Sequence, residues 1–440
     1  MSRLHDFVAI GIGPFNLGLA CLTAPIAGLD GVFLDRRAGF DWHPGMMLED
    51  ATLQTPFLAD LVTLADPTSR FSFLNYLKSQ GRIYSFYIRE NFFLLRREYN
   101  QYCQWAATQL PNLHFGHEVT RVEYDAAQEC YRVHGRHAGG EFVHAGRHLV
   151  LGTGSTPWLP ECCRPLGAPV SHSSSYLQDK PRLQAQRSIT VVGSGQSAAE
   201  IYRDLLQDLE PHGYALHWIT RSPRFFPLEY TKLTLEMTSP EYIDYFHALP
   251  SDRRDALIAQ QASLYKGING SMINEIFDLL YRKRLLGPLD TELVTNTELR
   301  ACHRRDDGGL QLELYQREQG RRYTHLTDAL VLATGYQARA PEFLAPIAGR
   351  IRRDERGRFG VDRHYGVSDD GRIFVQNAEL HTHGLASPDL GMGCYRNASI
   401  IARMLGYEHY PVERRIAFQH FGVPEHAESL PAPSTAAEVS

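Results

Sequence analysis

The 440-residue sequence predicts an α/β fold in which two doubly wound parallel-sheet domains are nested, together with a small helical region. Two observations carry this prediction. An apolar strand runs into a glycine turn and a helix at residues 7–23, and the same order returns at 188–209. Two further apolar strands end in glycine turns at 152–154 and 333–336. Such an order is typical of Rossmann-like dinucleotide-binding domains.

The first unit lies near the N-terminus. We expect a strand over residues 7–10, a helix over 17–23 and a second strand over 31–35 that ends in an acid. Glycines in the turn let the backbone approach a pyrophosphate at the helix start, and the acid can accept hydrogen bonds from ribose hydroxyls. The residues expected to bind a dinucleotide here are Gly11, Gly13, Pro14, Asn16 and Asp35.

Between the two units, the sequence predicts a helical stretch and an antiparallel insert. Residues 68–110 show mixed helical spacing and are predicted to be mainly helical. Short strands with Gly and Asp turns over 113–150 predict an antiparallel insert that returns to an apolar strand at 148–151.

The second unit starts at residue 188. We expect a strand over 188–192, a helix over 198–209 and a strand over 215–220, followed by Arg221. Residues 240–286 are predicted to be helical, and an apolar strand follows at 329–332. The chain after about residue 431 is rich in Pro, Ala and Ser and is predicted to be a disordered tail.

The two units end in opposite charges, which predicts two different cofactors. Asp35 favours FAD or NAD, whereas Arg221 could bind the 2′-phosphate of NADPH. An ordinary strand–helix turn would explain either unit taken alone, and Arg221 could be a surface arginine on a solvated loop. Both units together predict hydride transfer from NADPH to a flavin.

Composition excludes several other classes of protein. The formal net charge of −5 argues against nucleic acid or an anionic membrane as the main partner, and no apolar run reaches the ~20 residues that span a bilayer. The seven cysteines include no CxxC pair, which argues against a disulfide reductase and indicates a reducing cytoplasm. His381 and His383 form the sole candidate metal pair, and we expect no metal there.

Taken together, the motifs resemble those of the lysine/ornithine N-monooxygenase family of siderophore pathways. The likeness covers nearly the whole chain. It is carried by residues 11–17 (GIGPFNL), 42–46 (WHPGM), 54–58 (QTPFL), 60–62 (DLV), 73–77 (FLNYL), 192–200 (VGSGQSAAE), 333–336 (ATGY) and 382–385 (THGL).

The resemblance implies an enzyme that uses FAD, NADPH and O₂ to hydroxylate a primary amine. Reduced flavin would react with O₂ to give a C4a-hydroperoxide, which bound NADP⁺ shields from water. The neutral substrate amine would then attack the distal oxygen. The resemblance also implies a dimer or tetramer.

The resemblance assigns roles by motif. Gln54 would lie beside the flavin, with Trp42, His43 and Met46 lining its ring system. Asn269 would touch NADP⁺ and the substrate, and Gln54 and Asn269 are the two candidate catalytic residues. The other expected cofactor contacts are Gly193, Gly195, Gln196, Ser197, Arg221, Thr334, Gly335 and Leu390.

Departures from the family pattern predict the substrate. Ala59 stands where amino-acid-specific members have a lysine that binds the substrate carboxylate, and Leu235 and Gly391 replace an asparagine and a serine. The loss of three polar groups predicts an aliphatic diamine, putrescine first and cadaverine next, at the first step of hydroxamate siderophore synthesis. Asp389, Glu236, Asp60 or water could receive its distal ammonium.

Other readings of the substrate site remain open at this point. Another residue, such as an arginine, could bind a carboxylate, which would make the enzyme an L-lysine or L-ornithine N-hydroxylase. A flavin reductase or oxidase without productive oxygenation, or a nucleotide sensor, would share the same two units.

The domains are expected to interleave along the chain. Residues 1–157 and 341–430 would form the FAD domain, 158–220 and 293–340 the NADPH domain, and 221–292 the helical substrate region, with 431–440 as the tail.

Overall fold

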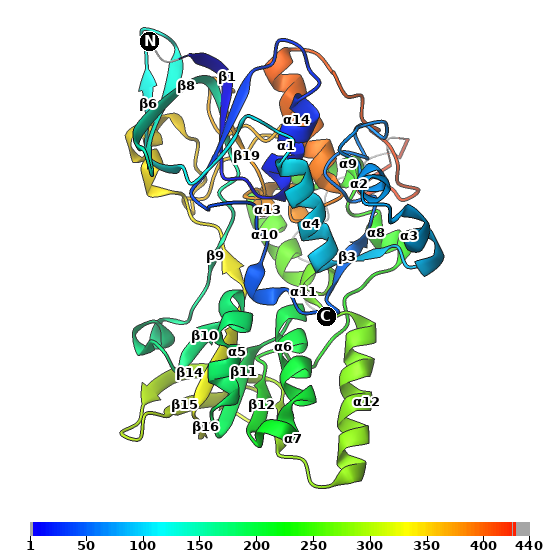
Figure 1. The fold of residues 1–440 in the computed structure, drawn as a ribbon, viewed down its shortest axis with the longest axis vertical. Coiled ribbons are helices and arrows are strands. Elements are labelled where there is room, and N and C mark those ends of the chain that lie inside the picture. The colour runs from blue at the N-terminus through cyan, green and yellow to red at the C-terminus, as the bar shows by residue number, and fades with distance from the viewer. Residues whose placement is uncertain (1–2, 425, 428–440) are drawn as a thin grey trace, which may run out of the picture.

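A computed structural model describes residues 3–424, 426 and 427 and shows two lobes that meet at a narrow waist (Figure 1). The upper lobe in this view holds the larger sheet with helices α1, α4 and α14, and the lower lobe holds a smaller parallel sheet with α6 and α12. The predicted α/β class with two nested nucleotide-binding folds is confirmed. The predicted tail at 431–440 lies outside the described residues.

The larger sheet has the strand order β5-β2-β1-β8-β7-β6, with β19 paired to β8. β1, β2, β5, β8 and β19 run parallel. The antiparallel insert predicted over 113–150 is wrong for its first strand, because β5 pairs parallel with β2, and is confirmed for β6, β7 and β8. The strands are β1 (Leu4–Ile10), β2 (Gly31–Asp35), β5 (Leu113–Phe115), β6 (Glu118–Asp125), β7 (Cys130–His137), β8 (Gly140–Leu151) and β19 (Ile373–Val375).

Helices pack on one face of this sheet and on one another, and they form the main core of the upper lobe. Phe7 and Phe33 on β1 and β2 pack edge to face at 5.4 Å and join a cluster with apolar residues of the helices. These helices are α1 (Pro14–Thr23), α2 (Phe73–Ser79), α3 (Ile83–Arg89), α4 (Arg96–Ala107) and α14 (Met392–Leu405).

The smaller sheet is all parallel, in the order β10-β17-β11-β12-β13. Apolar residues of α5, α6 and α12 pack on one face, and an antiparallel sheet of β14, β15 and β16 contributes leucines to a core on the other. The bounds are β10 (Val170–His172), α5 (Tyr176–Gln184), β11 (Ser188–Gly193), α6 (Gln196–Gln207), α7 (Leu209–His212), β12 (Ala215–Ile219), α12 (Gly270–Leu286), β13 (Thr291–Val294), β14 (Thr297–Arg304), β15 (Leu310–Gln316), β16 (Arg321–Thr327) and β17 (Ala329–Ala333).

Two of the segments that cross the waist lie side by side. β9 (Thr156–Pro157) pairs antiparallel with β18 (Tyr336–Gln337). The Trp158 amide donates to the Gly335 carbonyl at 2.9 Å, and Gly335 has a φ of +85°, which favours glycine. The small residues that end β8 and β17 therefore form the junction between the lobes.

The predicted helical stretch between residues 240 and 286 is confirmed. It consists of α9 (Pro240–Ala248), α10 (Ser251–Gln260), α11 (Ser263–Lys266) and α12, after a short α8 (Lys232–Leu235). α9 and α10 contact α13 (Leu380–His383) of the upper lobe.

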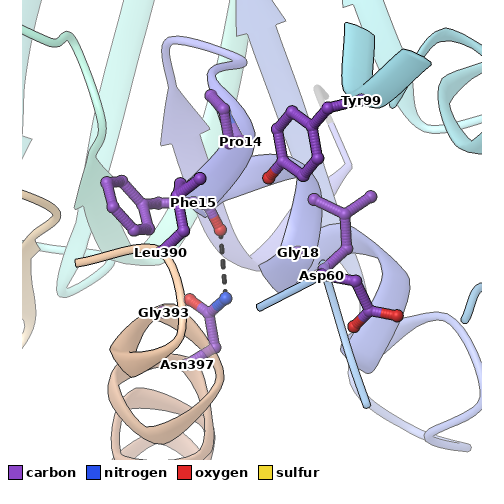
Figure 2. A pocket seen from close by; sticks show the side chains of 9 residues that line it. Pro14, Phe15, Gly18, Asp60, Tyr99, Leu390, Gly393 and Asn397 are labelled. Atoms are coloured by element: carbon purple, nitrogen blue, oxygen red, sulfur yellow. Dashed lines mark hydrogen bonds between the residues drawn. The ribbon is translucent and has the colours of Figure 1, made fainter. Parts of the chain in front are cut away.

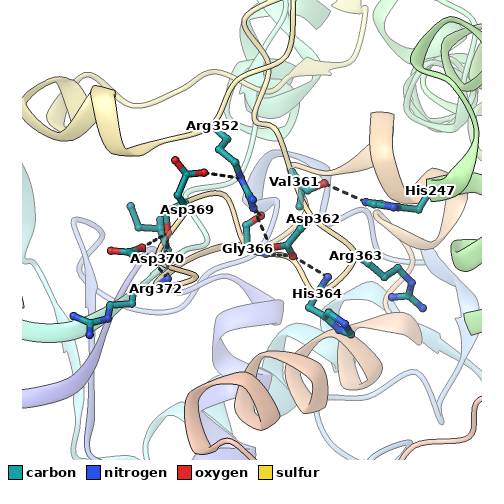
Figure 3. A network of polar contacts seen from close by, with 12 residues as sticks. His247, Arg352, Val361, Asp362, Arg363, His364, Gly366, Asp369, Asp370 and Arg372 are labelled. Atoms are coloured by element: carbon teal, nitrogen blue, oxygen red, sulfur yellow. Dashed lines mark hydrogen bonds and ion pairs between the residues drawn. The ribbon is translucent and has the colours of Figure 1, made fainter.

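A polar loop also attaches this helical region to the upper lobe (Figure 3). Arg352 donates to Asp362 at 2.9 Å, and the second oxygen of Asp362 accepts from the amides of His364 and Gly366 at 2.9 Å each. The loop carbonyl at Val361 in turn accepts from the ring of His247 on α9 at 3.2 Å.

The prediction of a mainly helical stretch over 68–110 missed one strand. β4 (Phe93–Leu95) pairs antiparallel with β3 (Thr52–Pro56), the strand that carries Gln54. Periodicity alone could not separate this short apolar run from a buried helix face. Among the described residues, no helix is long and apolar enough to cross a bilayer.

Candidate active site

The first glycine turn has the geometry of a pyrophosphate cradle. Gly11 has a φ of +90°, and a Cβ there would lie 2.4 Å from the carbonyl oxygen of Gly152. Gly13 has extended backbone at the start of α1, Pro14 follows as the first helical residue, and a Cβ at Gly13 would meet open space. The helix N-terminus is therefore uncovered at the point where a dinucleotide phosphate would bind, so the turn fits FAD.

Asp35 at the end of β2 holds this turn together. Its carboxylate accepts from the Ile12 amide at 2.7 Å and from the Arg37 amide and guanidinium at 2.8–3.0 Å. Burial pushes the pKa of Asp35 upward, but the hydrogen bonds and charge of Arg37 hold it below its usual value. The contact between Asp35 and a ribose hydroxyl stays a prediction. The Arg37 guanidinium already lies against the same carboxylate.

Asn16 is buried under the same turn and belongs to an amide network. Its side chain donates to the Gly11 carbonyl at 2.7 Å, and Gln376 donates to Asn16 at 3.1 Å and to Asn397 at 2.7 Å. Asn397 donates to the Phe15 carbonyl at 3.0 Å (Figure 2). No local motif marks Gln376 or Asn397, so sequence reasoning missed both.

Leu390 lies beside Phe15 at the start of α14 (Figure 2). With Pro14, Asp60 and Asn397 it lines a cavity of about 10 Å³ between α1 and α14. That volume has room for about one water molecule. Leu390 therefore packs directly on the turn that starts α1, where its predicted cofactor contact would be.

The Trp42–Met46 motif sits at the interface of the lobes. Gly45 packs so closely that a Cβ would lie 2.0 Å from the Ser174 carbonyl oxygen, and Met46 joins the core of the lower lobe. Trp42 and Tyr336 flank the His43 ring at centroid distances of 4.9 and 5.9 Å.

Desolvation by the surrounding protein, with the charges of Arg96 and Arg37, lowers the pKa of His43 to about 4. His43 is therefore a neutral ring at the interface of the lobes at neutral pH. A neutral aromatic wall of this kind suits the ring system of a flavin.

Gln54 on β3 has an unsatisfied donor. Its Nε2 atom is buried and has no hydrogen-bond partner within the described chain, and the same holds for the Thr55 hydroxyl next to it. Leaving a buried donor unpaired costs about 1–3 kcal/mol, which a polar ligand can recover. The position therefore fits the predicted contact with the flavin.

The second glycine turn connects to the helical region through Gln196. The Asn269 amide donates to Gln196 Oε1 at 2.8 Å, and Gln196 Nε2 donates to Glu200 at 3.0 Å. The Asn269 side chain caps α12 by accepting from the Ser271 amide at 2.9 Å. Of the predicted turn residues Gly193, Gly195, Gln196 and Ser197, Gln196 thus contacts Asn269 at the start of α6.

Gly193 packs directly against the second crossing segment. A Cβ at Gly193 would lie 2.5 Å from the Ala333 carbonyl oxygen. Thr334 donates to the Trp158 carbonyl at 2.5 Å, and the Gly335 carbonyl accepts from His172 at 3.1 Å. These residues hold the base of the second turn against the waist.

Arg96 reaches this turn from the upper lobe and was missed by sequence reasoning. Its guanidinium donates to both oxygens of Glu200 at 3.1 and 2.9 Å and to the Met46 carbonyl at 2.6 Å. Glu200 is 2% exposed. The ion pair links the flavin side of the cleft to the helix that follows the second turn.

Arg221 is exposed just after β12, where the second unit would meet a 2′-phosphate. Burial and the charge of Arg221 lower the pKa of Lys266, so the two cations lie near each other. The Lys266 carbonyl also faces Gly195, 3.2 Å from where a Cβ would stand. The position predicted from Arg221 therefore has a second cation, which fits an anionic phosphate.

Three of the predicted substrate residues meet. A Cβ at Gly391 would lie 3.0 Å from Asp389 Oδ1, 3.6 Å from Leu64 Cδ1 and 3.7 Å from Ala59 Cβ. Leu235 lies on a different element, at the end of α8.

Two of the carboxylates considered for the distal ammonium are already occupied. Asp60 accepts from the Val62, Thr63 and Phe73 amides at 2.6–2.9 Å. Glu236 accepts from the backbone of residues 418 and 419 at 3.0 and 3.1 Å. Both oxygens of each acid are bonded in this way, whereas Asp389, which lies near Ala59, accepts from the Met392 amide through Oδ1 and has no partner on Oδ2 among the described residues.

The two histidines of the possible metal pair have protein partners. His381 bonds to the Phe359 carbonyl at 2.8 Å and His383 to the Arg363 carbonyl at 3.2 Å. Within the described residues, no group of three potential metal ligands is found.

Comparisons with known proteins decide the family. The model for L-lysine 6-monooxygenase/L-ornithine 5-monooxygenase matches residues 3–338. The chain belongs to the lysine and ornithine N-monooxygenase family. A putrescine N-hydroxylase of Shewanella oneidensis is 56% identical to this N-monooxygenase over 420 residues, 95% of this chain and 84% of that protein. An alcaligin biosynthesis enzyme of Bordetella pertussis is 53% identical over 430 residues, 96% of this chain and 93% of that protein.

Solved structures agree with the fold of this N-monooxygenase. The FAD-bound cadaverine monooxygenase DfoA of Erwinia amylovora has a TM-score of 0.95 at 57% identity and covers 97% of this chain and 100% of its own. A Kutzneria ornithine N-hydroxylase with reduced FAD, NADP⁺ and L-ornithine has a TM-score of 0.84 at 29% identity, covering 92% and 99%.

FAD and NADPH are therefore the cofactors of this enzyme. When bound, the flavin takes hydride from NADPH and reduces O₂. The residues that fit the flavin are the first glycine turn, His43 and the unpartnered Gln54, and those that fit NADPH are the second turn and Arg221.

Proposed function

We propose that this N-monooxygenase hydroxylates one amine of an aliphatic diamine, putrescine first and cadaverine next, at the first step of hydroxamate siderophore synthesis. The observation that carries the proposal is the contact geometry of Ala59, Gly391 and Asp389. Two positions without polar side chains face a carboxylate there. The names of the putrescine and cadaverine relatives support the same substrate class.

The side chains around Ala59 disfavour an amino-acid substrate. Ala59 is 6% exposed, so its methyl group gives a substrate carboxylate no cation to bind. A charge-assisted hydrogen bond of the kind a lysine would supply contributes roughly 1.5–3 kcal/mol. A methylene chain against Ala59 and Leu64 instead gains about 0.8 kcal/mol per buried CH₂. With no lysine to bind a carboxylate and an apolar surface in its place, the site favours a substrate with a hydrocarbon chain and no carboxylate.

The proposed reaction balances as follows. A neutral primary amine, O₂, NADPH and a proton give a hydroxylamine, water and NADP⁺, so that one oxygen atom enters the N–H bond and the other leaves as water. In this proposal Gln54 and Asn269 are the residues beside the flavin and the reacting amine. The Asn269 backbone amide donates to Gln196, and its side-chain oxygen accepts from the Ser271 amide, which orients the side chain before substrate binds.

A parallel assay of hydroxylamine formation with putrescine, cadaverine, L-lysine and L-ornithine tests the function. We expect kcat/KM to be highest for putrescine, then cadaverine, with NADPH consumption matching hydroxylamine yield. Faster turnover of ornithine or lysine would overturn the diamine proposal. NADPH oxidation that yields only peroxide with all four amines would instead show an oxidase.

We also propose that the enzyme acts in the cytoplasm as a homodimer or homotetramer. All seven cysteines are free thiols, as in proteins of reducing compartments. Exposed apolar side chains gather on α3 and α12 and would suit a second copy of the chain; they are Tyr84, Tyr87, Ile88, Phe277, Tyr281 and Leu285. Sedimentation velocity should give the mass of a dimer or tetramer, and a monomer at all concentrations would refute the assembly.

A further inference from the structure

Asp389 is a carboxylate beside two positions, Ala59 and Gly391, that carry no polar side chain. It precedes α14 and accepts from the Met392 amide at 3.1 Å. The nearest atom to a Cβ placed at Gly391 would be Asp389 Oδ1, at 3.0 Å. The second oxygen, Oδ2, accepts no hydrogen bond within the described residues, so it is the one left for a ligand.

The positive charge that acts on Asp389 belongs to the Arg396 guanidinium, which already has other partners. Arg396 pairs with the buried Glu379 at 3.0 Å and donates to the Ser387 carbonyl. Burial raises the pKa of the Asp389 carboxyl because its charged form is poorly solvated. A cationic ligand would restore the charged form and replace the lost solvation.

Two other side chains near Asp389, those of Leu64 and Tyr230, reach the surface. Leu64 is 48% exposed and Tyr230 39% exposed. The charge of Asp389 contributes to the raised pKa of the Tyr230 phenol, so the two side chains lie near each other. A single acid among Ala59, Leu64 and Tyr230 suits a ligand with a hydrocarbon chain and one positive end.

We propose that Asp389 binds the ammonium group at the far end of the diamine and thereby selects diamines over monoamines and over α-amino acids. The proposal rests on the proposed function. It places the ammonium beside Ala59 and Gly391, which carry no polar side chain. The same carboxylate repels the carboxylate of an amino acid, so it acts against the competing substrates as well as for the diamine.

The test compares putrescine with n-butylamine, which has the same carbon chain and only one amine. Isothermal titration of the FAD- and NADP⁺-loaded enzyme gives both dissociation constants. In the wild type we expect putrescine to bind at least tenfold more tightly, a difference of about 1.4 kcal/mol. In Asp389→Asn, which keeps the oxygen that accepts from Met392, the ratio should fall to within about twofold.

A matched control and a second variant complete the experiment. Glu236→Gln changes an acid whose oxygens the backbone of residues 418 and 419 already occupies, so the ratio should stay at the wild-type value. Leu64→Lys should also lower the putrescine preference, because the new ammonium can reach Asp389 from an exposed position. This variant decides the question if Asp389→Asn does not fold.

The outcomes separate the two proposals. A wild-type enzyme that hydroxylates neither diamine would overturn the proposed function. Normal diamine hydroxylation with an unchanged ratio in Asp389→Asn, or a ratio lost only in Glu236→Gln, would overturn the role of Asp389 alone. A loss of binding for both amines in Asp389→Asn would show that the residue has only a structural role.

Discussion

At the scale of single residues, the substrate question depends on what is missing. Ala59 and Gly391 contribute no polar group, and the Asp389 carboxylate lies beside position 391. The sequence alone left three acids as partners for the ammonium. The structure removes Asp60 and Glu236, because backbone amides already occupy their oxygens.

Ala59→Lys tests the same proposal by adding a positive charge near Asp389. The new ammonium would lie within reach of Asp389 and would repel a diamine, so KM for putrescine should rise at least tenfold. The exposed Ala126→Lys, in the turn between β6 and β7, adds the same charge far from the cleft and should leave KM unchanged. Unchanged putrescine kinetics in Ala59→Lys would argue against placing residue 59 in the pocket.

At the scale of elements, the first glycine turn uses its two glycines differently. Gly11 needs a positive φ and contact with Gly152, so it is required by the folded chain itself. Gly13 has ordinary extended backbone and open space, so its small size is required only when a dinucleotide binds.

The two alanine variants should therefore separate folding from cofactor binding. Gly11→Ala should lower the free energy of unfolding of the apoprotein by roughly 2 kcal/mol or more, from the disfavoured φ and the clash. Gly13→Ala should leave that value nearly unchanged and still reduce bound FAD. Chemical unfolding and the visible absorbance of purified protein measure the two effects. Full FAD content in Gly13→Ala would contradict the cradle.

At the scale of the whole molecule, a buried ion pair joins the two lobes. Arg96 of the upper lobe pairs with Glu200 of α6, and Glu200 also accepts from Gln196, which holds Asn269. One ion pair thus connects the flavin side, the second turn and the helical region.

Arg96→Met should destabilise the protein because it leaves the buried Glu200 charge unpaired, at a cost of about 3–5 kcal/mol in the free energy of unfolding. The double variant Arg96→Met/Glu200→Met should recover most of the loss. The exposed neighbour Arg97→Met should change stability by less than about 0.5 kcal/mol. Denaturant unfolding checks all three, and equal stability of Arg96→Met and wild type would refute the link.

Local patterns in the sequence determined both nucleotide-binding units, the helical region and the family. Each strand–glycine turn–helix signal is written within about thirty residues and needs no distant contact. Short β4 was misjudged because its partner β3 lies outside the local window.

Only the tertiary structure decided how distant segments share one site. The approach of Asp389 and Gly391 to Ala59, the Arg96–Glu200 pair and the place of Lys266 beside Arg221 all join segments far apart in the chain. The physical reason is that a side chain's charge and space depend on its neighbours, and packing brings these neighbours together.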